Sequence, residues 1–457
     1  MTSQPGAPGA GNSRTAPAWR NWAGNVTAHP ERVRTPRSAA EVADEVSRAA
    51  ADGLPIRMTG SGHSFTPTAA TDGVLLRPDG LTAIRSIDAR AGLVTVEAGC
   101  RLTRLNSELL AHGLSLANMG DIDVQTVAGA IQTGTHGTGR LTAGIAAQVA
   151  GLELVLADGT IRTCSAPGPG AASPADAGPL AGLFDAARVG LGALGLLTAV
   201  TFRVLPAFLL TAREEPMRWS EVIARLPELT SQNEHFEFFW FPHTEGCLTK
   251  RNNRSDGPAR PLSRWRHWLD DEFLSNSLFG ATCRVGYQVP GAIPPINAIA
   301  SRALSARTYT DAAFRVFTSP RRVRFKEQEY AIPREHLTDV LREVRELLSS
   351  RDWRISFPIE VRVAPADEPW LSTAYGRDTA YIAIHIYRAS PHEEYFGAVE
   401  AIMTAAGGRP HWGKLHTRDA EYLRRAYPRF DDFAVLRDHV DPARRFGNAY
   451  LRQVLGA

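Results

Sequence analysis

A short turn in the first sixty-odd residues combines two glycines with one histidine. Gly60-Ser61-Gly62-His63-Ser64 follows the apolar run Pro55-Ile56-Arg57-Met58, with Thr59 between them. Glycine tolerates the positive φ of a phosphate-binding turn, so backbone N–H groups can close around a diphosphate. An imidazole at the tip of such a turn indicates a cofactor that is gripped and also tethered. Because Gly-Ser-Gly turns are common and a lone histidine is more often a plain turn residue, the pentapeptide alone leaves both interpretations open.

A second glycine cluster occupies residues 129–139. Residues 134–139 nearly fit a dinucleotide fingerprint, but the helix and the spaced acidic residue that should follow are missing. The cluster is either a glycine-rich connector or a second backbone wall around a flat, phosphate-bearing cofactor. The hydroxyls of Thr126, Thr133 and Thr135 would rim that wall. Two such loops in one domain favour the wall.

Charged residues in the second half of the chain offer acid–base chemistry. Glu360 and Arg362 alternate with Val361 on a predicted strand, so their side chains project from one face. They form either a structural ion pair or an active-site pair that orients or deprotonates a hydroxyl and stabilises negative charge. In His411-Trp412-Gly413-Lys414, Lys414 is either a solvated loop residue or a fixed cation beside an anionic intermediate.

The elements that must position these residues form a mixed α+β unit in the first two hundred residues. A capping box, Ser38 with Glu41, begins one helix, and a second helix over 101–112 ends at Gly113. Strands are predicted at 56–59, 73–77 and 93–97, and Asp158-Gly159 turns a hairpin. The regular βαβ alternation of a dinucleotide fold is absent.

Composition shifts towards aromatic residues after Pro206, where we place a domain boundary. Strands at 236–241, 357–363 and 381–387 and an amphipathic helix at 333–348 predict a sheet with helices on one face. A loop at 166–179, rich in Ala, Pro and Gly, is interpreted as an insertion. The expected division is a disordered tail (1–18), a first domain (19–206), a second domain (207–408) and a segment returning to the first (409–457).

Bulk properties exclude several classes of protein. A chain of 457 residues with 44% hydrophobic and 22% charged residues is typical of a globular protein with two or three domains. The net charge of +3 argues against a nucleic-acid partner, and the arginine clusters around 250–266 and 321–326 are interpreted as solvated loops. The apolar stretch 189–200 is too short to span a membrane. The expected location is cytoplasmic because no signal peptide is recognised. No metal site or disulfide is expected, since the cysteines are far apart: Cys100, Cys164, Cys247 and Cys283.

Motifs along nearly the whole chain, in order, resemble those of one enzyme family. They are Arg20-Asn21-Trp22, the 60–64 turn, Thr95-Val96-Glu97-Ala98-Gly99, the 129–139 cluster, Gly192-Ala193-Leu194-Gly195, Glu360-Val361-Arg362, His411-Trp412-Gly413-Lys414, Asp441-Pro442 and Asn448-Ala449-Tyr450-Leu451. The chain resembles the aldonolactone oxidoreductases, flavoenzymes of the vanillyl-alcohol oxidase type that include L-gulono- and D-arabinono-1,4-lactone oxidases. Alditol oxidase is a more distant likeness.

This resemblance implies an α+β fold of two domains, in which 19–206 bind FAD and 207–408 form an α+β substrate cap. The FAD would lie extended, with its pyrophosphate on the 60–64 turn and its C8-methyl bonded covalently to His63. The resemblance places the following residues around FAD: Thr59, Gly60, Ser61, Gly62, His63, Ser64, Gly120, Asp121, Thr126, Gly129, Thr133, Gly134, Thr135, His136, Leu197 and His411.

The implied reaction oxidises the hydroxyl next to the carbonyl of an aldono-1,4-lactone, with hydride transfer to flavin N5 and molecular oxygen reduced to hydrogen peroxide. Glu360 would bind or deprotonate the hydroxyl, Arg362 and Lys414 would stabilise negative charge, and His385 would contact substrate. Lactone oxidases often carry an aliphatic residue at His385 and alditol oxidases a histidine, so a polyol substrate stays open. Gly120 matches a position where larger side chains block oxygen, which favours an oxidase over a dehydrogenase with another acceptor. A flavin-free protein that binds some other phosphate ligand is the alternative from a different class.

Overall fold

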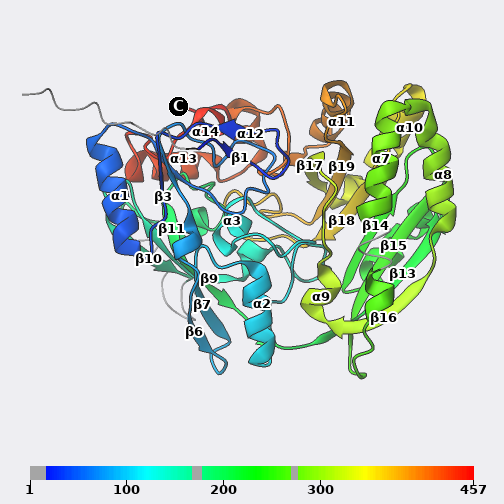
Figure 1. Ribbon diagram of the computed structural model, residues 1–457, viewed down its shortest axis with the longest axis horizontal. Helices are drawn as coiled ribbons and strands as arrows, with labels where there is room; N and C mark the ends of the chain where they lie inside the picture. The colour runs from blue at the N-terminus through cyan, green and yellow to red at the C-terminus, as the bar shows by residue number, and fades with distance from the viewer. Residues whose placement is uncertain (1–16, 167–177, 269–275) are drawn as a thin grey trace, which may run out of the picture.

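The computed structural model describes residues 17–166, 178–268 and 276–457. Two sheet-based units lie side by side, with the first half of the chain on the left of Figure 1 and the larger sheet on the right. None of the helices in the described part of the chain combines the length and apolar character needed to traverse a bilayer. The expected tail at 1–18 falls mostly outside the described residues, as does most of the loop predicted at 166–179.

The first unit contains two principal sheets. A parallel sheet has the order β3-β5-β4, made of Arg32–Arg34, Val74–Leu76 and Ile56–Met58. An antiparallel sheet has the order β10-β9-β11-β7-β6, made of Ile161–Ser165, Val149–Val155, Leu196–Arg203, Leu93–Glu97 and Ile84–Asp88. The unit also contains two short two-stranded sheets. One pairs β1 (Trp19–Arg20) with β2 (Thr27–Ala28), and the other pairs β8 (Leu114–Ser115) with β12 (Leu205–Pro206).

The helices of this unit begin and end largely where their capping residues predict. The Ser38 side chain caps α1 (Ala39–Ala51) by accepting a hydrogen bond from the Glu41 N–H. Gly113, which has a φ of +69°, follows the C-terminal end of α2 (Leu102–Ala111) and lets the chain leave the helix. The connector expected at 129–139 is partly helical, because α3 (Val127–Gln132) includes its first residues; Thr126 is its N-cap. A short helix, α4 (Leu183–Ala187), precedes β11.

The second unit is an eight-stranded antiparallel sheet. Its order is β16-β13-β15-β14-β18-β19-β17-β20, made of Arg307–Ala312, Leu209–Arg218, Gly246–Ser255, His235–Trp240, Ile359–Ala364, Thr379–Tyr387, Phe325–Pro333 and Arg409–Pro410. Three amphipathic helices, α5 (Trp219–Gln232), α10 (Leu337–Ser350) and α11 (Glu393–Ala405), pack their apolar residues on one face of this sheet. The helix predicted from residue 333 begins at Leu337, because β17 continues to Pro333. Smaller helices are α6 (Arg264–His267), α7 (Phe279–Gln288), α8 (Ile293–Ala303) and α9 (Ala313–Phe317).

The last fifty residues pack on the first unit, next to α1 in Figure 1. Helices α12 (Ala420–Ala426), α13 (Phe430–Val440) and α14 (Ala449–Leu455) share one apolar core with α2, α3 and the five-stranded sheet. Buried Arg57 of β4 donates to the carbonyls of Thr68, Leu191, Gly192 and Phe446 at 2.5–2.9 Å. One side chain therefore ties the Gly60 turn to two distant segments. The α+β class predicted from the sequence is confirmed.

Candidate active site

Two adjoining cavities form the candidate site: residues of both units line the first, and residues of the first unit alone line the second. The first is lined by charged residues of the eight-stranded sheet together with His63, Ser64, Gln125 and Thr133. The second follows the 59–64 turn, α3 and the 191–197 segment, and the same four residues line it too. The two cavities therefore meet at His63, and together they form a long site with one polar, reactive end.

In the second cavity the Gly60 turn and Gly129 approach each other closely. A Cβ on Gly60 would lie 2.6 Å from Thr126 Oγ1, and one on Gly129 would lie 2.9 Å from the same oxygen. Gly62 has a φ of +75°, a backbone conformation that is strained in residues with a side chain. Side chains at Gly60 and Gly129 would not fit, so the backbone itself forms this wall of the cavity, and its N–H groups can donate to an anionic ligand. These residues fit the diphosphate of FAD.

His63 stands at the junction and stacks on Trp22, with ring centroids 5.2 Å apart and planes at 23°. Burial, helped by the positive charge of Lys414, lowers the pKa of His63 to about 4. The imidazole is therefore neutral near pH 7 and keeps a lone pair for bond formation.

The segment that carries Lys414 is held between the glycine turn and β17. On one side Phe65 N–H donates to the Gly413 carbonyl at 2.7 Å, and on the other Leu415 N–H donates to the Glu327 carbonyl at 2.9 Å. Trp412 is completely buried and donates its indole N–H to the Leu371 carbonyl. Backbone bonds and a buried ring thus fix the position of Lys414 at the polar end of the site.

One cluster of charges surrounds Arg362 on the face of the sheet opposite the α5, α10 and α11 helices. Its guanidinium forms an ion pair with Glu360, donates Nε–H to Glu237 Oε2 at 2.9 Å and lies 3.8 Å from Asp121 Oδ2. Arg321 donates to the same Asp121 oxygen at 3.0 Å. Glu360 and Arg362 form the ion pair that the sequence predicts. A purely structural ion pair needs only one carboxylate, whereas the carboxylates of Glu360, Glu237 and Asp121 all surround Arg362 here.

Glu360 is the acid in this cluster whose proton affinity is raised. Burial is the main cause, the charges of Asp121 and Glu237 add to it, and Arg362 opposes it; the pKa of Glu360 reaches about 7. By contrast, Arg362 and the neighbouring arginine outweigh burial at Asp121 and hold its pKa far below the ordinary value. A carboxyl with a pKa near 7 can accept and return a proton at neutral pH.

A second cluster surrounds Lys414. Its ammonium forms an ion pair with Glu327 and lies 4.0 Å from Glu329 Oε2. Glu327 also faces His385, whose Nε2 is 3.4 Å from Glu327 Oε1. The carboxylates of Glu327 and Glu329 outweigh the effect of burial and raise the pKa of Lys414, so the ammonium group stays protonated in the cavity.

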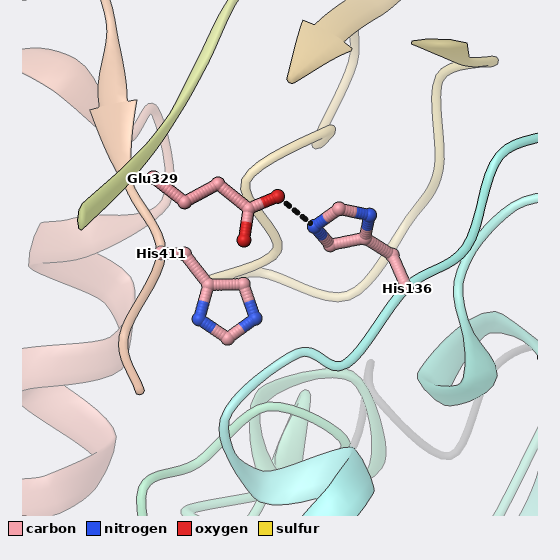
Figure 2. A group of neighbouring side chains, drawn as sticks. All are labelled: His136, Glu329 and His411. Carbon is pink, nitrogen blue, oxygen red and sulfur yellow. Dashed lines mark ion pairs between the residues drawn. The ribbon is translucent and has the colours of Figure 1, made fainter. Parts of the chain in front are cut away.

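Glu329 forms an ion pair with His136 of the glycine-rich segment, and His411 of the Lys414 segment lies beside the two, as Figure 2 shows. Its Oε1 lies 2.9 Å from His136 Nε2, while Tyr381 stacks on the His136 ring. His411 Nδ1 accepts the Gly413 N–H at 3.0 Å. Potential ligand atoms of His136, Glu329 and His411 lie within 4.8 Å of one another. Lys414 already supplies positive charge beside Glu329, so we interpret the trio as part of the ion-pair network.

The other residues predicted around the cofactor divide by position. The second cavity is lined by Thr59, Ser61, Thr126, Gly129 and Leu197. The first is lined by Asp121, Thr135, His136 and His411, and Thr133 lines both. Gly134, at φ +73°, shapes the turn after α3 and lines neither cavity. Gly120 packs against Thr135, whose Cγ2 would be 2.9 Å from an added Cβ.

Sequence reasoning missed Glu327, Glu329 and Glu237, and it named Trp22 only as part of a family motif, without a role in the site. It assigned Arg321 to a solvated loop, although that side chain lines the first cavity. The sequence shows that Glu327 and Glu329 alternate, which places them on one face of a strand, but it does not show that this face is buried.

The sequence matches the family model described as D-arabinono-1,4-lactone oxidase over residues 200–454 and the one described as FAD binding domain over residues 30–165. The L-gulono-1,4-lactone dehydrogenase of Mycobacterium tuberculosis is 41% identical over 441 residues, which cover 96% of this chain and 100% of the relative. The L-gulonolactone oxidase of Bos taurus is 32% identical over 443 residues, which cover 95% and 98%. A crystal structure of cholesterol oxidase from B. sterolicum matches with a TM-score of 0.81 and 19% identity over 100% of both chains. The predicted vanillyl-alcohol-oxidase-type fold with an FAD-binding domain is confirmed.

Proposed function

Since this chain belongs to the D-arabinono-1,4-lactone oxidase family, we propose that it is an FAD-dependent oxidoreductase that oxidises an aldono-1,4-lactone at the hydroxyl next to the carbonyl. Molecular oxygen is the proposed acceptor, with hydrogen peroxide as the product. The observation that carries the proposal is the convergence of Glu360, Arg362 and Lys414 on the cavity that meets the glycine turns at His63.

Oxidation of a secondary alcohol removes one proton and one hydride, and the chain's residues account for the proton and the charge. Glu360, with its pKa near 7, hydrogen-bonds the hydroxyl and accepts its proton. Arg362 stabilises negative charge on the substrate oxygen as the proton leaves. Lys414, fixed by Glu327, supplies positive charge from the second cluster, and His385 offers a further polar contact for the sugar hydroxyls.

FAD, when bound, accepts the hydride. We propose that the Gly60 and Gly129 wall would hold the diphosphate and that a ring nitrogen of His63 would replace one hydrogen of the flavin C8-methyl group. That bond formation releases two protons and two electrons, which the proposed acceptor, molecular oxygen, would take up. The neutral, stacked imidazole of His63 supports the tether, because only the unprotonated ring is a nucleophile.

A dehydrogenase is the second candidate, because the relative at 41% identity carries that name. Gly120 favours the oxidase only through its match to a family position where larger side chains block oxygen, because here the residue packs against Thr135. His385 keeps a polyol substrate as the alternative on the substrate side.

Two measurements on the purified holoprotein test these assignments. Acid precipitation should leave the yellow colour in the pellet for the wild type and release it to the supernatant for His63→Ala. Oxygen uptake and dye reduction are then measured on a panel of aldono-1,4-lactones and alditols. Oxygen uptake with lactones supports the proposal; dye reduction without oxygen uptake supports the dehydrogenase, and turnover of alditols alone rejects the lactone substrate. A colourless protein that takes up no added FAD would refute the flavoenzyme assignment.

A further inference from the structure

A third cavity lies beside the first one, at the reactive end of the site. Its volume is about 600 Å³, whereas that of the first cavity is about 180 Å³. His63, Asp121 and Arg321 line both cavities, so the two meet there. The walls of the third cavity come from β13, β14, β15, β16 and α9 of the second unit and from the 121–124 segment of the first. We call this cavity the side chamber, and its volume is typical of a small-molecule site.

The charges that line the side chamber balance one another. The lining contains five acidic and five basic side chains. Glu214 accepts two hydrogen bonds from Arg307, at 2.7 and 3.0 Å. Lys250 lies 3.4 Å from Glu237 and donates to the Val316 carbonyl at 3.1 Å. A ligand with a net charge would meet no excess of the opposite sign, so the lining favours a neutral ligand.

Aromatic rings supply much of the apolar lining of the side chamber. Phe239, Tyr309 and Phe314 are half-buried and line it. The face of an aromatic ring carries partial negative charge, so it attracts the weakly positive C–H groups of a sugar ring. The hydroxyls of the same sugar can bond to the charged side chains, because a carboxylate or a guanidinium in an ion pair keeps further acceptors or donors. Aromatic rings beside fixed polar groups therefore suit a carbohydrate better than a lipid chain or an isolated ion.

A chain of charged contacts leads from the proposed proton acceptor into the side chamber. Arg362 pairs with Glu360 and also donates to Glu237 at 2.9 Å. Glu237 in turn lines the side chamber, where Lys250 is its second partner. A substrate hydroxyl at Glu360 is therefore separated from the chamber by one arginine. The exocyclic chain of an aldono-1,4-lactone leaves the ring at a carbon that does not react, so this chain can extend past Arg362.

We propose that the side chamber binds a second, neutral sugar ring carried by the exocyclic chain of the lactone. The substrate is then a glycosylated aldono-1,4-lactone. This assignment rests on the proposed function and adds to it the part of the substrate that does not react. The first cavity has to hold both the flavin ring and the lactone, which leaves the larger side chamber for the second sugar ring.

Steady-state kinetics of the holoprotein with two matched substrates test the proposal. One is the aldono-1,4-lactone that the substrate panel identifies as the best, and the other is the same lactone with a glucosyl group on its terminal hydroxyl. Turnover is followed by oxygen uptake or by dye reduction. We expect kcat/KM to be at least about tenfold higher for the glucosylated lactone, mainly through a lower KM.

Two variants alter the side chamber without altering the first cavity, because Leu248 and Phe314 line only the chamber. Leu248→Trp fills part of the chamber, so it should abolish the advantage of the glucosylated lactone and leave kcat/KM of the plain lactone unchanged. Phe314→Leu removes one ring and should lower kcat/KM of the glucosylated lactone alone, by about fivefold. The matched control is Leu141→Trp, which makes the same change at a 74% exposed leucine outside these cavities and should behave as the wild type.

Circular dichroism checks that every variant folds as the wild type does. Equal kcat/KM for the two lactones in the wild type overturns the proposal, as does a glucosyl advantage that survives Leu248→Trp. If Leu248→Trp slows both lactones equally, the chamber is a common entrance, and this outcome also overturns the proposal. Turnover of the plain lactone alone refutes the second sugar ring and leaves the proposed function standing, whereas turnover of neither lactone refutes both.

Discussion

Replacing Glu360 with glutamine tests the proposed proton acceptor most directly. With a pKa of about 7, the ionised fraction of Glu360 rises from about one tenth at pH 6 to about nine tenths at pH 8. If the ionised form accepts the substrate proton, kcat/KM rises about tenfold over that interval in the wild type. Glu360→Gln cannot accept the proton, so we expect a loss of about 10²–10⁴-fold at pH 8 and no rise with pH.

The assay is the anaerobic rate of flavin bleaching by lactone, because it reports the oxidation step without the reaction of the acceptor. Glu237→Gln is the matched control. The charge of Glu237 helps to raise the pKa of Glu360, so removing it should move the rise to lower pH without abolishing it. Neither His63 nor His411 explains the rise, since burial lowers their pKa values to about 4 and 3. A rise that persists at the same pH in Glu360→Gln would refute the assignment.

Three further predictions follow from the same contacts. Gly60→Ala places a Cβ 2.6 Å from Thr126 Oγ1, so the purified variant should contain much less flavin, and Thr126→Ser should not restore it because the oxygen remains. Glu327→Gln removes the main partner that raises the pKa of Lys414, so the alkaline loss of activity in a pH profile should move to lower pH, whereas Glu393→Gln, on the exposed start of α11, should leave the profile unchanged. Folding raises the pKa of Glu360 from 4.5 to about 7, so the free energy of unfolding should fall by up to about 3 kcal/mol as pH rises from about 4.5 to 7. Thermal unfolding should show a smaller fall for Glu360→Gln than for the wild type. An equal fall in both proteins would contradict the raised pKa.

Local features of the sequence were sufficient to predict one half of the site. A glycine turn after a strand and a Glu-x-Arg alternation have geometric consequences within a few residues, so Gly60, Gly62, Glu360 and Arg362 were recognised and lie on the cavities. The start of the amphipathic helix was misplaced at residue 333 because periodicity does not record where β17 ends. The helix α3 was missed because glycine lowers helix propensity, and the Thr126 cap and buried apolar packing outweigh that cost.

The part that could not be predicted depends on segments that meet only in the folded chain. Glu327 and Glu329 on a strand would ordinarily mark a solvent-facing edge, yet both are buried because β17 receives Lys414 and His136 from two other segments. A fold gains little from burying so many charges, since desolvation offsets most of their attraction, and apolar residues of similar size would stabilise the sheet as well. Val361 and Val363, on the other face of β18, show that the same strand packs an apolar core where no chemistry is required. The concentration of acids and cations on one face is therefore best explained by the reaction in the cavity, where fixed charges are already oriented before substrate arrives.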